Sequence, residues 1–174
     1  MNYDFKKISL IAVKALKIAG EGDLVQAEKL YREVILQAEQ CDHYQLPDFY
    51  HQLASVLSQM DRPEEALHFY EMGLAISLKQ ANNDNCDIGV GVSRYFFGEQ
   101  LLKMKRYKDA LNMVAPSLNK SEIGNRLLPM IKAISLWNLG RKDDARVIAN
   151  EVIDSAPSDE KKHGFSQRFK EEFT

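Results

Sequence analysis

Residues 50–73 read YHQLASVLSQMDRPEEALHFYEMG and predict two helices joined by a tight turn. Before the turn, Tyr50 and the leucines after it recur at three- and four-residue spacing, which is typical of one face of a helix. After the turn, Pro63 has the backbone angle of a first helical turn and lacks the amide hydrogen that this turn leaves unpaired. Ala54 and Ala66 are small, so they allow two helix backbones to approach closely where they cross. The stretch therefore predicts a helical hairpin.

The same arrangement returns along the chain, which indicates an internal repeat. Small residues that lie twelve positions apart form four pairs: Ala15 with Ala27, Ala54 with Ala66, Gly98 with Ala110, and Ala133 with Ala145. Nine positions before the second member of each pair stands a large aliphatic residue: Ile18, Leu57, Leu101 and Leu136. A single pair could arise by chance, whereas four pairs in register with their apolar neighbours predict four helical hairpins.

The turns of these hairpins resemble those of the tetratricopeptide repeat family. Residues 22–27, 61–66, 105–110 and 140–145 are similar to the family's turn, its polar or acidic pair and its alanine. The resemblance implies an all-α, right-handed superhelical solenoid of about four antiparallel helix pairs plus a C-terminal capping helix. The four alanines are 39, 44 and 35 positions apart, compared with a usual period of about 34. We therefore expect longer second helices, or longer loops, in the first two units.

We expect one domain over residues 1–174, with units of about 4–46, 47–87, 88–120 and 121–157 and a terminal helix over 158–174. Helices are predicted to begin near caps or prolines: Asp23, Pro47, Pro63, Ser121 with Glu122, and Ser158. The second helix of the third unit is expected over 107–118, with Pro116 favouring an earlier end. Arg94 and Pro129 depart from the family, which prefers a bulky apolar side chain at both positions.

The terminal helix carries a stripe of three phenylalanines, Phe165, Phe169 and Phe173, four positions apart on one face. In helical-repeat proteins such a stripe covers the apolar end of the last unit, which is the interpretation that we favour. A partner-binding helix, or a homodimer formed through this helix, is the alternative.

Composition argues against several kinds of partner. A formal net charge of −2 and a pI near 6.1 do not suit a broad basic surface for nucleic acid. The apolar stretch 8–19 is interrupted by Lys14 and Lys17, so we expect no membrane insertion and no signal peptide. Cys41 and Cys86 do not make the disulfide framework of a small secreted domain. These features predict a cytoplasmic protein.

The sequence contains none of the short motifs that carry chemistry. It lacks a glycine-rich phosphate loop, the His-Glu-x-x-His of metalloproteases, a paired CxxC and a nucleophile elbow. Cys41, His43 and His51 form a cluster that could suggest a metal, but their spacing is not that of ligands. Paired acids such as Glu64 and Glu65 lie at predicted helix starts, where the helix dipole favours them. We therefore expect no enzyme, no metal and no cofactor.

The resemblance implies a binding surface in a concave groove, formed by the first helix of each unit. Aromatic and aliphatic side chains there would anchor a partner, Lys103 would bind a carboxylate, and Glu99 would bind a basic group. Burial between units or under the terminal helix is the alternative interpretation for four residues: Tyr95, Leu127, Met130 and Trp137. The predicted partner-binding residues are His51, Ser55, Tyr95, Glu99, Lys103, Leu127, Met130, Ile134 and Trp137.

These observations predict a non-catalytic protein–protein interaction module that binds a partner protein or peptide as an adaptor or scaffold. Two alternatives stay open: a dedicated chaperone or immunity protein for one bacterial partner, and a sensor of a signalling peptide. Binding of acidic carboxyl-terminal tails is not expected, because the basic clamp of the family members that bind them is replaced by Ala12, Leu16, His51 and Ser55.

Overall fold

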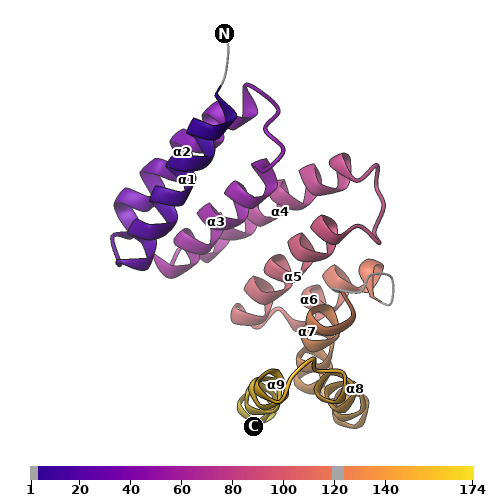
Figure 1. Cartoon of the computed structure of the whole chain (residues 1–174). Helices are drawn as coiled ribbons and strands as arrows, with labels where there is room; N and C mark the ends of the chain where they lie inside the picture. The colour runs from indigo at the N-terminus through magenta and orange to yellow at the C-terminus, as the bar shows by residue number, and fades with distance from the viewer. Residues whose placement is uncertain (1–3, 119–123) are drawn as a thin grey trace. The chain divides into compact units, whose positions relative to one another are not determined.

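The computed structural model describes residues 4–118 and 124–174, and all regular secondary structure within these ranges is helical (Figure 1). The all-α fold predicted from the sequence is therefore confirmed. In chain order the elements are α1 (Phe5–Gly20), α2 (Leu24–Glu39), α3 (Leu46–Gln59), α4 (Pro63–Gln80), α5 (Ile88–Lys103), α6 (Tyr107–Val114), the short 3₁₀ helix η1 (Ala115–Ser117), α7 (Gly124–Asn138), α8 (Lys142–Asp154) and α9 (Asp159–Glu172).

The chain forms two compact units, of which unit 1 ends at Gln80 and unit 2 begins at Ala81. The boundary falls in the segment 81–87, which is rich in asparagine and aspartate. Asn82 and Asn83 both adopt left-handed backbone angles, with φ of 52° and 62°, and asparagine tolerates that conformation better than most residues. The single domain expected from the sequence stays a prediction.

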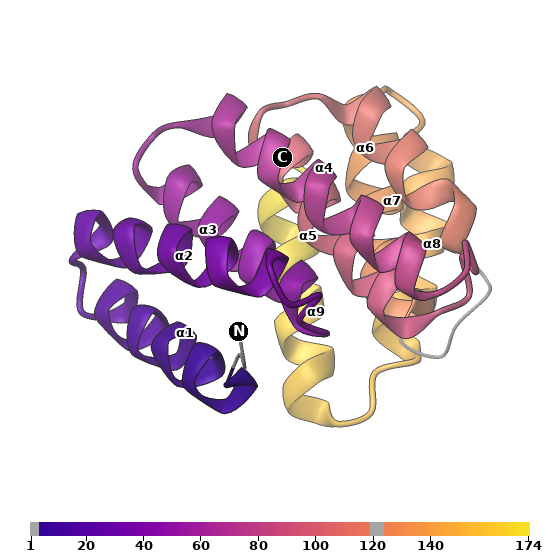
Figure 2. The same ribbon diagram turned by 90° about the horizontal axis from the view of Figure 1, so that it is seen from above.

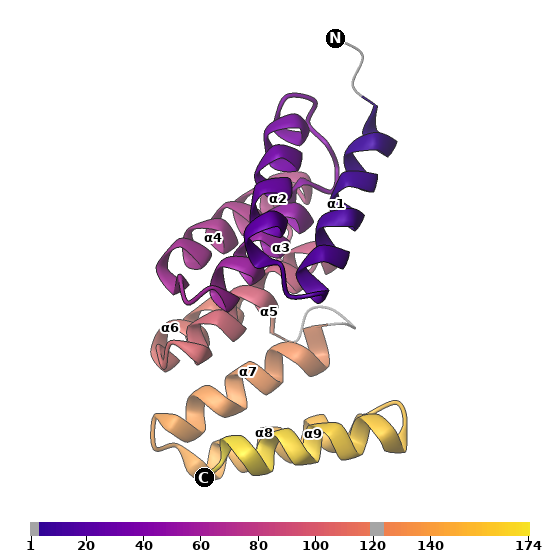
Figure 3. The same cartoon turned by 90° about the vertical axis from the view of Figure 1, so that its left-hand side faces the viewer.

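Each unit is built from helical hairpins. In unit 1, α1 pairs with α2 and α3 pairs with α4, and α2 also packs against α3 (Figure 1). In unit 2, α5 pairs with α6 and α7 pairs with α8 (Figure 2), and α9 lies beside α8 (Figure 3). The second helices of the first two hairpins, α2 and α4, have 16 and 18 residues, compared with 8 in α6 and 13 in α8. The wide alanine spacing therefore reflects longer second helices, as expected.

All four hairpins contain the same turn. A residue with left-handed backbone angles follows each first helix: Gly22, Asp61, Lys105 and Gly140, with φ of 92°, 58°, 57° and 84°. The amide of the next residue then donates to a carbonyl five positions earlier, that of Ile18, Leu57, Leu101 or Leu136, at 3.2, 3.0, 2.8 and 2.9 Å. This is the Schellman pattern, which satisfies carbonyl groups at the end of a helix. The aliphatic residues of the repeat thus mark where each first helix ends.

The small residues of the repeat lie in the cores of the two units. Ala27, Ala66, Ala110 and Ala145 are all fully buried. In the third hairpin the small partner is Gly98, and a β-carbon added there would lie 3.1 Å from Ile131 Cγ2 and 3.3 Å from Val114 Cγ1. At these distances a β-carbon would press on both neighbouring side chains, so the spacing of small residues reflects close helix packing.

Three of the four turns also contain an ion pair that was not predicted from the sequence. An arginine four positions before the alanine pairs with an acid one position before it: Arg62 with Glu65, Arg106 with Asp109, and Arg141 with Asp144, at 2.6, 2.8 and 2.7 Å. All of these groups are at least one-third exposed, so each pair contributes little to stability. Their recurrence is independent support for the repeat.

The second helix of the third unit has the earlier end that Pro116 favoured. Within the range 107–118, α6 stops at Val114 and the chain continues as η1. Pro116 explains the change, since it has no amide hydrogen to continue the α-helical bonds. The helix start expected at Ser121 and Glu122 lies outside the described residues.

Arg94 is buried on α5, at a position where the tetratricopeptide repeat family that the sequence resembles prefers a bulky apolar side chain. Its Nη1 donates to the carbonyl of Met113 at 2.8 Å, and its Nη2 donates to Asn85 Oδ1 at 2.7 Å. Met113 lies at the end of α6, where carbonyl groups lack helical partners and the helix dipole favours a cation. Burial lowers the pKa of Arg94, yet arginine remains protonated in proteins. Arg94 therefore caps the short helix α6.

Candidate functional site

The two partner-binding residues predicted in unit 1 lie in different environments. Ser55 is exposed on α3, whereas His51 is only 5% exposed. The His51 ring stacks on Tyr70 of α4, with centroids 6.1 Å apart, and lies against Gly73. Burial lowers the pKa of His51 to about 4, so the ring is neutral at physiological pH. His51 therefore belongs to the core of its hairpin.

The four residues predicted on α7 are mostly covered. Met130 and Ile134 are 3% and 0% exposed, so they lie in the core of unit 2. Leu127 and Trp137 are half-buried. The physical reason is that α7 packs against α5, α6 and α8, which leaves little of its circumference open. Burial, the alternative interpretation given for Met130, thus describes that residue in this structure, and Ile134, for which burial was not considered, is buried as well.

The residues predicted on α5 share one face of the helix. Tyr95, Glu99 and Lys103 follow one another at four-residue spacing, which places them on one side of the helix. Apolar residues accompany them on this side: Ile88 is 55% exposed and Phe96 is 41% exposed, and the rings of Tyr95 and Phe96 have centroids 5.5 Å apart. We call the following six residues the α5 outer face: Ile88, Val92, Tyr95, Phe96, Glu99 and Lys103.

One edge of the α5 outer face contacts α9 through an ion pair. Arg168 Nη2 donates to both carboxylate oxygens of Glu99, at 2.9 and 2.8 Å. The two side chains are 28% and 19% exposed, so solvent screens this pair less than a fully exposed one. Burial and the Glu99 carboxylate raise the pKa of the nearby Tyr95. The Tyr95 hydroxyl therefore stays protonated and able to donate a hydrogen bond.

Trp137 contacts both α8 and α9. Phe173 stacks on its ring, with the planes 1° apart and the centroids 4.3 Å apart. From α8, Lys142 Nζ and Arg146 Cζ lie 4.7 and 5.3 Å from the centroid of the same ring, within the range of cation–π attraction. Phe169, beside Phe173, is buried. The phenylalanine stripe thus covers part of unit 2, as the favoured interpretation of the sequence expected.

Sequence reasoning missed Ile88, Val92, Phe96 and Arg168. A signal existed for the first three, because residues 88–103 are apolar around the whole circumference of the helix rather than along one stripe. That pattern is typical of a helix that is covered on more than one side. For Arg168 no local signal existed, because its partner Glu99 lies 69 positions earlier in the chain.

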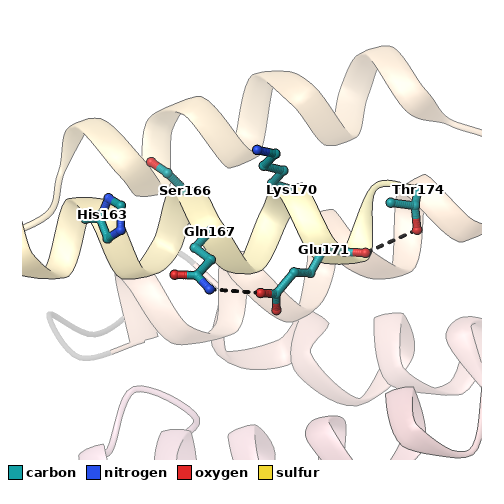
Figure 4. Close-up of a pocket in the computed structure, with 6 residues that line it drawn as sticks. All are labelled: His163, Ser166, Gln167, Lys170, Glu171 and Thr174. Atoms are coloured by element: carbon teal, nitrogen blue, oxygen red, sulfur yellow. Dashed lines mark hydrogen bonds between the residues drawn. The ribbon is translucent and has the colours of Figure 1, made fainter.

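Other kinds of site are not formed by the described residues. Within residues 4–118 and 124–174, no three histidine, cysteine or carboxylate side chains are grouped as a metal site would require. A surface hollow of about 570 Å³ is lined by polar side chains on the face of α9 turned away from Phe169 (Figure 4): His163, Ser166, Gln167, Lys170, Glu171 and Thr174. Among the described helices, none combines the length and apolar character needed to cross a bilayer.

One stretch of the chain matches a known repeat. Residues 48–83, which contain all of α4 and all of α3 except its first two residues, match the family described as tetratricopeptide repeat. No curated protein matches the chain in sequence.

Solved structures resemble the chain more broadly, although at low sequence identity. A kinesin light chain candidate from Podosopora anserina with nearly identical TPR-like repeats is 12% identical, over 98% of this chain and 92% of its own, with a TM-score of 0.72. BtubC (BKLC) from P. vanneervenii is 21% identical, over 86% of this chain and 62% of its own, with a TM-score of 0.72. YrrB, described as a TPR protein with an unusual peptide-binding site, is 13% identical over 90% of each chain, with a TM-score of 0.52. At these identities the similarity concerns the fold alone.

Proposed function

Because the chain carries a tetratricopeptide repeat at residues 48–83 and has the fold of TPR proteins, we propose that it is a non-catalytic adaptor that binds a partner protein or peptide. The proposed contact surface is the α5 outer face. The observation that carries this proposal is the exposure of apolar and aromatic side chains on the side of α5 turned to solvent. YrrB, which has a peptide-binding site, adds support at the level of the fold.

The composition of the α5 outer face suits a binding surface better than a solvated one. The solvent side of a helix in a globular protein is usually charged or polar. Here Ile88 and Phe96 are exposed, Val92 and Tyr95 on the same face are half-buried, and exposed apolar patches mark interaction sites. Tyrosine is also among the residue types that contribute most to binding energy in interfaces.

The charged residue at one end of the α5 outer face would orient a partner segment along the helix. Lys103 is exposed at the end of α5, and its ammonium group can bind a carboxylate. We therefore expect a partner segment that places apolar side chains on Tyr95 and Phe96 and an acid near Lys103.

Replacing both aromatic residues, as Tyr95→Ala/Phe96→Ala, is expected to weaken partner binding at least tenfold. The reason is that loss of an aromatic anchor at an interface costs about 1–2 kcal/mol or more, and 1.4 kcal/mol corresponds to a factor of ten. The partner is first captured from native cell extract with the wild-type chain. The affinity of the purified partner for each variant is then measured by isothermal titration calorimetry, after circular dichroism has shown that the helices are intact.

A matched control is Leu36→Ala/Tyr44→Ala, which removes two exposed apolar side chains from unit 1. This control is expected to bind like the wild type. Equal affinity of wild type and Tyr95→Ala/Phe96→Ala would place the contact surface elsewhere.

The proposal includes a cytoplasmic location, to which the sequence adds support because two widely spaced cysteines, Cys41 and Cys86, do not make the disulfide framework of a small secreted domain. Cell fractionation tests this location. The dedicated chaperone, immunity-protein and peptide-sensor roles gain no support from the described residues beyond that for an adaptor.

A further inference from the structure

The helix α9 binds the edge of the α5 outer face in the way that a separate ligand would. It presents Arg168 to the Glu99 carboxylate with two hydrogen bonds, of 2.9 and 2.8 Å. It also presents Phe173 to the Trp137 ring as a parallel stack, with centroids 4.3 Å apart. Between these two contacts, Phe169 is buried. A charged anchor and two aromatic anchors are the kinds of group that dominate binding between proteins.

Apart from these contacts, α9 lies beside α8, and Lys162 Nζ of α9 lies 3.5 Å from Asp154 Oδ1 of α8. Of its 14 residues, Phe169 is the one that is buried. Its opposite face carries the polar side chains of the surface hollow in Figure 4, including Gln167 and Lys170. The segment between α8 and α9 covers only residues 155–158, so a released α9 stays close to its site. Elements with few buried apolar contacts are those that open most readily.

We propose that the surface formed by Glu99, Tyr95 and Trp137 is a docking site for a helical partner segment, and that α9 is its built-in competitor. The partner segment carries an arginine followed by aromatic residues one and five positions later, which is the pattern of Arg168, Phe169 and Phe173. Charge complementarity selects the arginine, because Glu99 is the carboxylate at this surface and its two oxygens both accept from Arg168. This inference rests on the proposed function, since it names the partner for the edge of the α5 outer face.

A competitor in the same chain lowers the apparent affinity for a partner. The partner binds only the fraction of molecules in which α9 is released, and its apparent dissociation constant rises as that fraction falls. Weakening α9 is therefore expected to strengthen binding of an added segment that carries the same anchors.

The probe is a fluorescein-labelled synthetic peptide of residues 158–174, and its binding to the full-length chain is followed by fluorescence anisotropy. Arg168→Ala/Phe173→Ala in the chain removes both anchors of the competitor. This variant is expected to bind the wild-type peptide at least tenfold more tightly than the wild-type chain does. The control Gln167→Ala/Lys170→Ala changes the opposite face of α9 and is expected to bind the peptide like the wild type. Equal affinities of all three chains would overturn the proposal.

A charge exchange tests the same surface with α9 unaltered in the chain. A Glu99→Arg chain is expected to bind a peptide that carries Arg168→Glu at least tenfold more tightly than it binds the wild-type peptide. Absence of this preference would overturn the proposed anchor. Light scattering tests whether a second copy of the chain occupies the site instead of a partner. If the wild-type chain is a dimer and Arg168→Ala/Phe173→Ala is a monomer, the α9 of a second copy fills the site, and the partner proposal is overturned.

The two proposals fail separately. If the peptide shows no dependence on these variants while the captured partner still requires Tyr95 and Phe96, the docking site under α9 is wrong and the adaptor function stands. If the peptide behaves as expected while capture is independent of Phe96, the docking site under α9 stands and the proposed contact with the exposed part of the α5 outer face is wrong.

Discussion

Replacing Gly73 with valine is expected to destabilise unit 1 by about 3 kcal/mol, because the added side chain has no room beside His51. A β-carbon built on Gly73 lies 2.5 Å from His51 Nε2, 2.7 Å from His51 Cδ2 and 3.2 Å from the carbonyl oxygen of Pro47. The ring has little space to move aside, since it is buried and stacked on Tyr70. Valine gains less than about 1 kcal/mol in helix propensity over glycine, which does not offset the clash. Urea unfolding followed by circular dichroism measures the loss.

Two further variants test whether the loss of stability comes from the contact with His51 or from the introduction of valine into a helix. Gly20→Val, at the end of α1, meets nothing within 4 Å, and it is expected to change stability by no more than about 0.5 kcal/mol. In a His51→Ala background, Gly73→Val is expected to lose at least about 1 kcal/mol less than in the wild type, because the ring is gone. Additive losses from the two changes would show that the contact with His51 is not the cause.

Acidification is expected to remove about 3 kcal/mol from the stability of the folded chain through His51 alone. Burial lowers the pKa of His51 from 6.5 to about 4 in the folded state, while the unfolded chain keeps the ordinary value. The unfolded state therefore binds this proton more readily. The contribution is complete above pH 6.5 and falls as the pH drops to about 4. The size follows from the difference between 6.5 and about 4, at 1.36 kcal/mol per unit.

The measurement is a series of urea unfolding curves between pH 7.5 and pH 4, for the wild type and two single variants. His51→Asn is expected to be less stable at neutral pH but to lose less stability on acidification than the wild type. His68→Asn removes an exposed histidine of the same hairpin and is expected to keep the wild-type dependence. An unchanged pH dependence in His51→Asn would show that other groups control the acid response.

The fold could be predicted largely because its signals are local. The start of α4 at Pro63 was predicted correctly, since proline marks the first helical turn. The four turns could be located from Ile18, Leu57, Leu101 and Leu136, because each Schellman bond spans only five positions. Residues within about five positions of one another are therefore sufficient to predict such features.

The candidate site could be predicted only in part, because exposure depends on distant segments. The spacing of Tyr95, Glu99 and Lys103 was enough to place them on one face. The position of Met130 or Ile134 in a repeat does not say which neighbouring helices cover it, and both are buried. The contacts of Glu99 with Arg168 and of Trp137 with Phe173 join residues 69 and 36 positions apart. No periodicity in a single sequence reports such pairs.

The His51 result shows a related limit. Its place in the repeat resembles a groove position, but Gly73 on the partner helix has no side chain, and the ring lies against that glycine. A glycine at helical spacing with Ala66 and Tyr70 was visible in the sequence, yet its effect on the opposite residue depends on the crossing of α3 and α4.

The central claim, that a partner binds the α5 outer face, is tested most directly by hydrogen exchange of the full-length chain with and without its captured partner. The account predicts slower amide exchange on binding within residues 88–103 and a change within residues 159–172, while residues 63–80 exchange as in the free chain. Slower exchange confined to residues 63–80, or to any other part of unit 1, would contradict the claim.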